Sequence, residues 1–169
     1  NSYMHEIYLG SPAGPASSPN WSTLVPQQGG VAMAGDVNCD DFDDVIVGMP
    51  DQIYPPSLGR ALVYAGSPSG VNPDPTWTME SDRTTAQFGR AAVAAGDVNG
   101  DGCGDVAIGA PTYVSRTAGY LFVYLGSPQG LSLVPQGQAF RLAGGTGFGT
   151  TASTAGDVNG DGLDELLGT

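Results

Sequence analysis

The feature that most constrains this sequence is a short acidic loop that recurs three times. Its clearest copy carries oxygen-bearing side chains at loop positions 1, 3, 5 and 9: Asp97, Asn99, Asp101 and Asp105. Side-chain oxygens that alternate along a tight, glycine-containing loop can converge on one point, as a hard cation such as Ca²⁺ requires. The apolar run Val106–Ile108 follows and ends at Gly-Ala-Pro, which is typical of a short buried strand. The repeating unit is therefore a metal-binding loop that leads into a strand.

The three copies keep one spacing. Their first residues, Asp36, Asp97 and Asp157, are 61 and 60 residues apart. Two further markers recur with them: Gly-Ser-Pro begins at Gly10, Gly66 and Gly126, and Phe-Gly begins at Phe88 and Phe148, with Gln27-Gln28 in the first copy. A fixed period of this length predicts a repeat fold. The period also explains the 27 glycines and 13 prolines, which would otherwise suggest disorder.

Each period predicts four strands. In the middle copy they are Arg90–Ala95, Asp105–Ala110, Gly119–Leu125 and a fourth near Ala139–Leu142, with a variable loop over Pro111–Ala118. Nothing has helical periodicity, and glycine or proline interrupts every few residues. The predicted class is all-β, with four-stranded blades of the β-propeller type.

The order of the predicted strands divides one blade between the two ends of the sequence. The chain opens on strands three and four, Tyr3–Leu9 and Ser22–Val25, and it stops after Glu165–Leu167, the second strand of a third set. The predicted division is residues 1–26 for the two opening strands, 27–87 for repeat 1, 88–147 for repeat 2 and 148–169 for the first half of repeat 3. The total is twelve strands.

Three blades are fewer than the four to eight of a closed propeller. We therefore expect the open sheet edges to pair with other copies of the chain. Such a head-to-tail contact gives a ring if the rotation closes and a filament if it does not. A fragment cut from a larger propeller would have the same phase, and the sequence leaves both alternatives open.

Phe88-Gly89, the loop Asp97–Asp105 and Gly109-Ala110-Pro111 together resemble an FG-GAP repeat, the unit of integrin α-subunit propellers and of many bacterial extracellular proteins. The resemblance covers nearly the whole chain in three registers. It is strongest to the bacterial versions, which carry a Tyr-rich strand followed by Gly-Ser-Pro. It implies up to three Ca²⁺ ions, each held by side chains at positions 1, 3, 5 and 9 and by the carbonyl at position 7. The implied ligands are Asp36, Asn38, Asp40, Phe42 and Asp44; Asp97, Asn99, Asp101, Cys103 and Asp105; and Asp157, Asn159, Asp161, Leu163 and Glu165.

The first and third copies depart from this pattern. Asp41 replaces a loop glycine, which predicts a strained and weakened first site. Met49 replaces the alanine of Gly-Ala-Pro, and Glu165 is a longer last ligand. An EF-hand is excluded, because its acidic ligand at position 12 would fall on Val47, Ile108 and Gly168.

Other residues suggest modifications. Cys39 and Cys103 lie in adjacent metal loops, where a disulfide and two unpaired thiols are both open. Asn20-Trp21-Ser22 fits the N-glycosylation pattern in a Pro/Ser-rich stretch. His5, the only histidine, has no nucleophile assigned to it, so a core or edge role is expected.

The charge of the chain favours metal binding over other partners. The net charge is −12, from 17 acids and five arginines, and twelve of the acids lie in the three loops. Three divalent cations would offset half of this charge. The chain has no basic stripe for nucleic acid and no apolar run long enough for membrane insertion. It starts at Asn1 without a leader, as a mature or excised piece would.

No catalytic constellation is present, so the sequence predicts a non-enzyme. The leading hypothesis is a calcium-stabilised extracellular module, secreted or at the cell surface, with a structural or adhesion role and other copies of itself as partners. Two alternatives are a lectin-like carbohydrate-binding propeller and a fragment of a larger integrin-like propeller that binds a protein or glycan ligand. The aromatic residues near variable loops, Tyr54, Trp77 and Tyr113, would serve the carbohydrate alternative.

Overall fold

A computed structural model of the chain describes residues 2–26, 29–50, 58–115, 118–133 and 147–169. These residues form strands and turns without a helix, and so contain no helix that could cross a membrane. The strands are β1 Ser2–Ile7, β2 Trp21–Pro26, β3 Gly30–Gly35, β4 Asp44–Met49, β5 Leu58–Tyr64, β6 Trp77–Thr84, β7 Ala92–Gly96, β8 Asp105–Ser115, β9 Ala118–Tyr124, β10 Ala152–Gly156 and β11 Glu165–Gly168.

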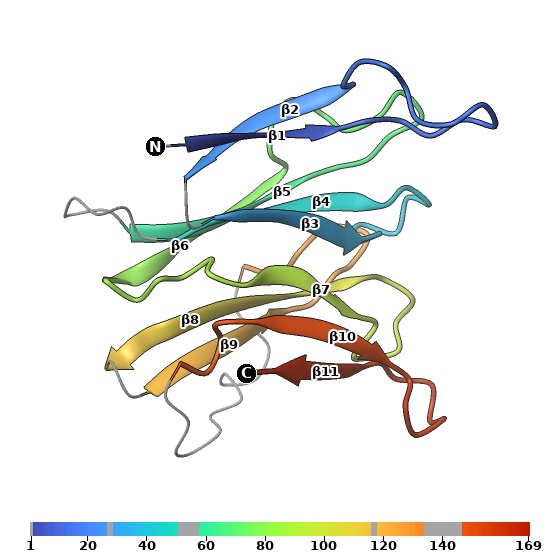
Figure 1. Ribbon diagram of the computed structural model, residues 1–169. Coiled ribbons are helices and arrows are strands. Elements are labelled where there is room, and N and C mark those ends of the chain that lie inside the picture. The colour runs from blue at the N-terminus through green and yellow to red at the C-terminus, as the bar shows by residue number, and fades with distance from the viewer. Residues whose placement is uncertain (1, 27–28, 51–57, 116–117, 134–146) are drawn as a thin grey trace.

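The strands form four antiparallel sheets that are stacked face to face (Figure 1). In order along the stack they are β1-β2, β3-β4-β5-β6, β7-β8-β9 and β10-β11. Strands that follow one another in the chain are neighbours in each sheet, so every sheet is a simple meander. The two ends of the chain lie at opposite ends of the stack.

The hydrophobic core consists of three layers, one between each pair of successive sheets. The alternation of side chains along a strand sends neighbouring residues into different layers. In β4, Val45 packs with Trp21 of β2, whereas Ile46 packs with Ile108 of β8. A third layer joins Leu121 of β9 to the last sheet. Each sheet with a neighbour on both sides therefore contributes to two cores.

The repeated Phe-Gly and Gly-Ala-Pro signatures meet between sheets. Phe88 and Phe148 are buried, and the glycine after each has a positive φ. A methyl group on Gly48 would collide with the carbonyl of Gly89, and a methyl group on Gly109 would collide with the carbonyl of Gly149. The signature thus marks a close approach of two backbones, which explains why glycine is used there.

Most predicted strands are found, but one predicted loop is wrong. β7, β8 and β9 begin within two residues of the predicted starts. The variable loop expected over Pro111–Ala118 is largely strand, because β8 continues to Ser115 and pairs there with Ala118. Tyr113 stabilises this extension by packing on Tyr120 of β9, with ring centroids 5.1 Å apart. The strand expected near Ala139–Leu142 and the pair Gln27-Gln28 lie outside the described residues.

Candidate metal-binding loops

Each of the three acidic loops joins the two strands of a hairpin, and all three lie along one edge of the stack, on the right in Figure 1. They connect β3 to β4, β7 to β8, and β10 to β11. A register shift precedes every loop, at Gly35, Gly96 and Gly156, and these glycines have φ of 77°, 86° and 70°. The same bulge therefore turns each chain into its loop.

The carboxylate at position 1 organises each loop. Its Oδ1 accepts the backbone N–H of position 5 over 3.0–3.1 Å, and its Oδ2 accepts that of position 6 over 2.8 Å, in all three copies. The residues at position 1 are Asp36, Asp97 and Asp157. For Asp157 these bonds, chiefly that from Gly162, lower the pKa of the carboxyl. The loops are thus folded by their own acidic residues.

Positions 3 and 5 continue the pattern. In the middle loop, Asn99 Oδ1 accepts the N–H of Asp101 over 3.1 Å, and Asp101 Oδ1 accepts the N–H of Cys103 over 2.9 Å. The corresponding bonds exist in the other two loops. Three segments of different sequence context therefore adopt one hydrogen-bonding scheme.

The carboxylate at position 9 ties the hairpin to the next strand. Asp105 is fully buried, and it accepts the N–H groups of Val98 and Gly126, each over 2.8 Å. Asp44 is equally buried and has the same two kinds of donor, Val37 and Gly66. Burial raises the pKa of Asp44, and it raises the pKa of Asp105 to about 6. An ionised carboxylate in this position is costly without a cation nearby.

The third loop differs at position 9. Glu165 is partly exposed, and it accepts the N–H of Val158 over 2.7 Å and the amide of Asn159 over 3.0 Å. The longer side chain reaches back into its own loop.

The first loop has a strained backbone, as predicted for Asp41. Positions 4 and 6 have positive φ in every copy, and glycine occupies them in the second and third loops. In the first loop they are Cys39 (φ 58°) and Asp41 (φ 71°). Residues with a side chain are disfavoured in this left-handed region.

The donor chemistry fits Ca²⁺, since positions 1, 3, 5 and 9 carry carboxylate or amide oxygens and position 7 has its backbone carbonyl oxygen. In the described part of the chain, however, no group of three or more His, Cys, Asp or Glu side chains is close enough to hold a metal ion. The carboxylates instead face backbone N–H groups of the same loops. Coordination would therefore need the asparagine oxygen and the position 7 carbonyl as well as rotated carboxylates.

Adjacent loops are also joined to each other. The N–H of position 8 donates to the carbonyl of position 1 in the preceding loop, from Gly104 to Asp36 over 2.7 Å and from Asp164 to Asp97 over 3.0 Å. Asp164 Oδ2 also accepts the N–H of Asp97 over 3.0 Å. This role of position 8 was not predicted from the sequence. The signal available was an aspartate at that position in two of the three copies.

A second contact links position 7 of one loop to position 4 of the loop before it. The structure joins Cys103 to Cys39 in a disulfide with Cα atoms 5.2 Å apart. In the next pair of loops, Leu163 lies against Gly100, where an added Cβ would be 2.8 Å from Leu163 Cδ2. The disulfide thus joins two loop positions that are also in contact in the next pair of loops, where no cysteine is present.

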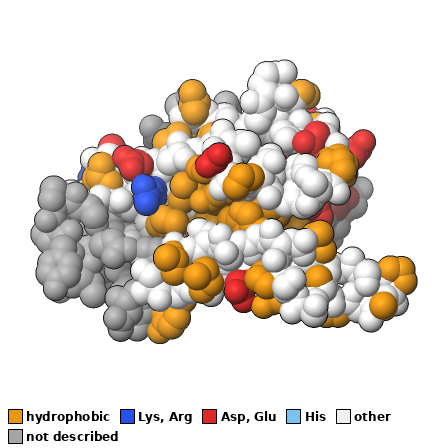
Figure 2. All heavy atoms as spheres, turned by 90° about the horizontal axis from the view of Figure 1, so that it is seen from above, with side chains coloured by type: hydrophobic (Ala, Val, Ile, Leu, Met, Phe, Trp, Pro, Cys, Tyr) orange, Lys and Arg blue, Asp and Glu red, His pale blue; other side chains and the backbone are white. Residues whose placement is uncertain are grey.

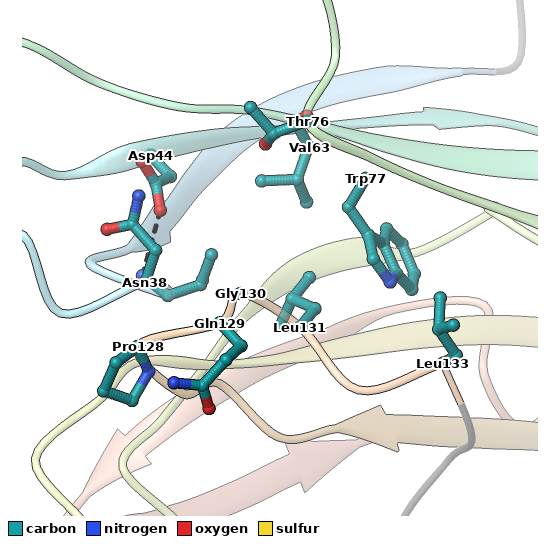
Figure 3. Close-up of a pocket in the computed structure, with 11 residues that line it drawn as sticks. Asn38, Asp44, Val63, Thr76, Trp77, Pro128, Gln129, Gly130, Leu131 and Leu133 are labelled. Carbon is teal, nitrogen blue, oxygen red and sulfur yellow. Dashed lines mark hydrogen bonds between the residues drawn. The ribbon is translucent and has the colours of Figure 1, made fainter.

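A pocket of about 420 Å³ lies between the β3–β6 sheet and the turn that follows β9 (Figure 3). Asn38 and Asp44 of the first loop line one side, and Gln129 lines the other. Trp77 also lines the pocket, but its ring packs edge-on against Tyr124 and is 8% exposed. It does not offer a free flat surface.

The remaining residues singled out from the sequence are dispersed. Asn20 is exposed, and its Oδ1 accepts the N–H of Leu9 over 3.3 Å. His5 lies on β1 opposite Thr23. Tyr113 donates to Asp82 over 2.7 Å and has the Arg83 guanidinium 4.6 Å above its ring, so both its polar and aromatic groups are engaged. Tyr54 lies outside the described residues.

Comparisons with known proteins agree with this architecture. Residues 88–124 match the FG-GAP repeat family model. The chain is 31% identical to human integrin alpha-8 over 149 residues, 36% identical to Drosophila melanogaster integrin alpha-PS2 over 105 residues, and 30% identical to bovine phosphatidylinositol-glycan-specific phospholipase D over 183 aligned residues. These matches include 82%, 56% and 97% of this chain.

The chain spans only 14%, 7% and 22% of the lengths of these relatives, respectively. The similarity to integrin α subunits suggests an integrin-like propeller fragment. Residues 88–124 are an FG-GAP repeat, and together with this similarity they support an integrin-like FG-GAP family for the chain.

Proposed function

We propose that this chain is a calcium-stabilised structural or adhesion module that assembles with other copies of itself by completing blades between them. In this proposal the four sheets are two complete blades and two halves of a split blade, arranged as three FG-GAP repeats of about 60 residues. The three acidic loops each bind one Ca²⁺ ion.

The observation that carries the calcium proposal is the common hydrogen-bonding scheme of the loops. Positions 1, 3 and 5 are oriented by the same backbone N–H groups in all three copies. The two buried carboxylates at position 9, Asp44 and Asp105, add negative charge that a cation would offset. The loop backbone is already ordered, so only the carboxylate side chains would have to reorient, and less conformational entropy is lost on binding.

We propose an extracellular location, secreted or at the cell surface, because a disulfide joins the first two loops. The Tyr-rich strands followed by Gly-Ser-Pro support a similarity to bacterial extracellular FG-GAP proteins in particular. We further propose that the role is not enzymatic. One relative is named as a phospholipase D, and this chain spans 22% of its length.

A glycan-binding role has less support. The indole of Trp77 is packed against Tyr124, and Tyr113 is held between Arg83 and its neighbouring aromatic rings. Neither residue presents the open aromatic surface on which a sugar would stack.

Calorimetric titration with Ca²⁺ and thermal melting with and without a chelator test the proposal. At calcium concentrations 100 times Kd, each occupied site adds about 2.7 kcal/mol to the free energy of unfolding, which corresponds to roughly 5–10 °C in Tm for a chain of this size. The variant Asp97→Ala/Asp101→Ala should bind one ion fewer and lose part of this shift. Asp74→Ala, an exposed acid outside the loops, is the matched control. Equal melting of the native chain in calcium and in chelator would contradict the proposal.

Light scattering tests the assembly part separately. In millimolar Ca²⁺ the mass should exceed the 17.1 kDa of a single chain. A 17.1 kDa species at every protein concentration would refute self-assembly and leave the calcium sites untouched.

A further inference from the structure

We infer that successive copies dock in one defined register, in which Gly160 and Asp157 of one copy contact Phe42 and Asp43 of the next. The inference rests on the proposed self-assembly and specifies its interface. The partner at this surface is a second copy of the chain. The third acidic loop of one copy faces the first acidic loop of the next copy.

The register follows from contacts that the chain makes twice with itself. Position 7 of each later loop lies on position 4 of the loop before it, as Cys103 on Cys39 and Leu163 on Gly100. The N–H of position 8 donates to the carbonyl of position 1 in the same two pairs of loops. The pairing of loops is therefore a property of the repeat.

The two ends of the stack carry the two halves of a third such pair. At the C-terminal end, Gly160 stands at position 4 with no atom within 4 Å of the place where its Cβ would be. At the N-terminal end, Phe42 stands at position 7 and is 36% exposed, close to the 38% of Leu163, so its side chain is accessible to a position 4 residue of another loop. Asp43, at position 8, corresponds to Asp164, whose backbone N–H and side chain both bond to the preceding loop.

The strand edges fit the same register. Within the two inner sheets, Val45 lies opposite Tyr64 and Val106 lies opposite Tyr124. By position in the repeat, Leu166 of β11 corresponds to the valines and Tyr8, after β1, corresponds to the tyrosines. A joined sheet would therefore run β10, β11, then β1 and β2 of the next copy, and each edge would receive the hydrogen bonds that it lacks.

The same joining supplies a donor for the third loop. Asp44 and Asp105 each accept an N–H from the Gly-Ser-Pro turn after the third strand, from Gly66 and Gly126. The equivalent acid is Glu165, and the equivalent glycine is Gly10, which belongs to the other end of the chain. In the proposed register, Gly10 of the second copy would donate its N–H to Glu165.

Exposed apolar side chains are concentrated at these two ends. Among the described residues, twelve large hydrophobic side chains are exposed, and eight of them lie before residue 25 or after residue 157. Figure 2, seen from the side of β1 and β2, shows hydrophobic side chains gathered on this face. Met4 and Leu24 form a cross-strand pair there and are 57% and 60% exposed. At the other end, Val158 is 69% exposed, whereas Val37 at the same loop position is 3% exposed.

The native disulfide provides the design of a test. Phe42→Cys with Gly160→Cys recreates the position 7 to position 4 pair between two copies. After mild oxidation in millimolar Ca²⁺, this variant should give a ladder of 17.1 kDa multiples on a non-reducing gel, and peptide mapping should find the 42–160 link. Reductant should collapse the ladder.

Two further variants control for chance collisions and for misfolding. Leu133→Cys with Gly160→Cys places a cysteine at a 74% exposed site in the turn after β9, which is none of the loop positions of the proposed contact, so it should not form a ladder. Gly100→Cys with Leu163→Cys uses the same two loop positions within one chain and should give a linked monomer. That product would show that cysteines at these positions are compatible with the fold.

The outcomes separate the inference from the proposed function. Assemblies by light scattering without the 42–160 link, or with as much linking in the Leu133 control, would overturn the register and leave self-assembly standing. Monomers without any link would overturn both, and would leave the flanking repeats of a longer polypeptide as the occupants of these edges. In either case, calcium binding is judged by its own titration.

Discussion

The indole N–H of Trp77 donates to the backbone carbonyl of Ser132 over 3.3 Å, and this bond joins the β3–β6 sheet to the turn after β9. Trp21 makes the same bond to Asn72 over 3.2 Å, one sheet earlier. Each ring also packs edge-on against a tyrosine of the next sheet, at 5.1 Å and 5.0 Å between ring centroids. Successive sheets are thus held by a repeated tryptophan contact.

Replacing Trp77 separates the two parts of this contact. Trp77→Phe keeps an aromatic ring but loses the N–H, so it should lower the free energy of unfolding by about 1 kcal/mol. Trp77→Ala also leaves a cavity and should cost about 3–5 kcal/mol. Denaturant unfolding measures both values. Leu133→Ala changes a largely exposed side chain and should leave the free energy of unfolding nearly unchanged. Equal losses of stability in all three variants would contradict the role of Trp77 in joining the two sheets.

A methyl group on Gly109 should be poorly tolerated, because it would enter the space of the Gly149 carbonyl. We expect Gly109→Ala to destabilise the chain by about 1–3 kcal/mol through overpacking. Gly30→Ala is the matched control, since nothing lies within 4 Å of its Cβ position. That substitution should raise stability by about 0.4–1 kcal/mol. Chemical denaturation would refute the close approach if both variants changed stability in the same direction.

Reduction of the Cys39–Cys103 disulfide should destabilise the chain. The bridge spans a sequence separation of 64 residues, for which loop-closure entropy gives about 4 kcal/mol. Reductant should therefore lower the Tm of the native chain markedly. The variant Cys39→Ser/Cys103→Ser should melt near the reduced value and should not respond to reductant. A native chain whose melting ignores reductant would show that the bridge does not form in solution.

Relief of strain at position 6 of the first loop should be stabilising. Asp41 has φ 71°, where the other loops use Gly102 and Gly162. Asp41→Gly should raise the free energy of unfolding by up to about 1 kcal/mol, because glycine adopts this region without steric cost. Gly102→Asp is the reciprocal change and should lower it. If the first substitution destabilises the chain, then the Asp41 side chain makes a contribution that outweighs its backbone strain.

Much of the fold could be predicted from periodicity alone. The loop spacing and the alternation of apolar residues placed the hairpins, because a strand pair on each side of a fixed loop leaves few alternatives. The extension of β8 could not be predicted in this way. Pro111 suggested a loop, whereas the packing of Tyr113 on Tyr120 and Phe122 is a contact between strands.

The candidate site was predictable in composition but not in arrangement. Spacing identified the acidic positions 1, 5 and 9 without showing that Asp44 and Asp105 are buried, because burial is determined by the neighbouring Gly-Ser-Pro turn. The disulfide depends on a distance between two loops that sequence does not contain. The role of Asp164 likewise requires the position of the preceding loop, whose backbone it contacts.

The stacking of sheets makes this protein close to a one-dimensional system. Each sheet contacts the sheets before and after it, so the free energy of unfolding approximates a sum of individual sheets and nearest-neighbour interfaces. An added repeat contributes one further interface, and the terminal sheets, covered on one face, should exchange their amide hydrogens first. Stability would then rise with the number of joined repeats, and the slowest exchange would move toward the middle of the longest stack.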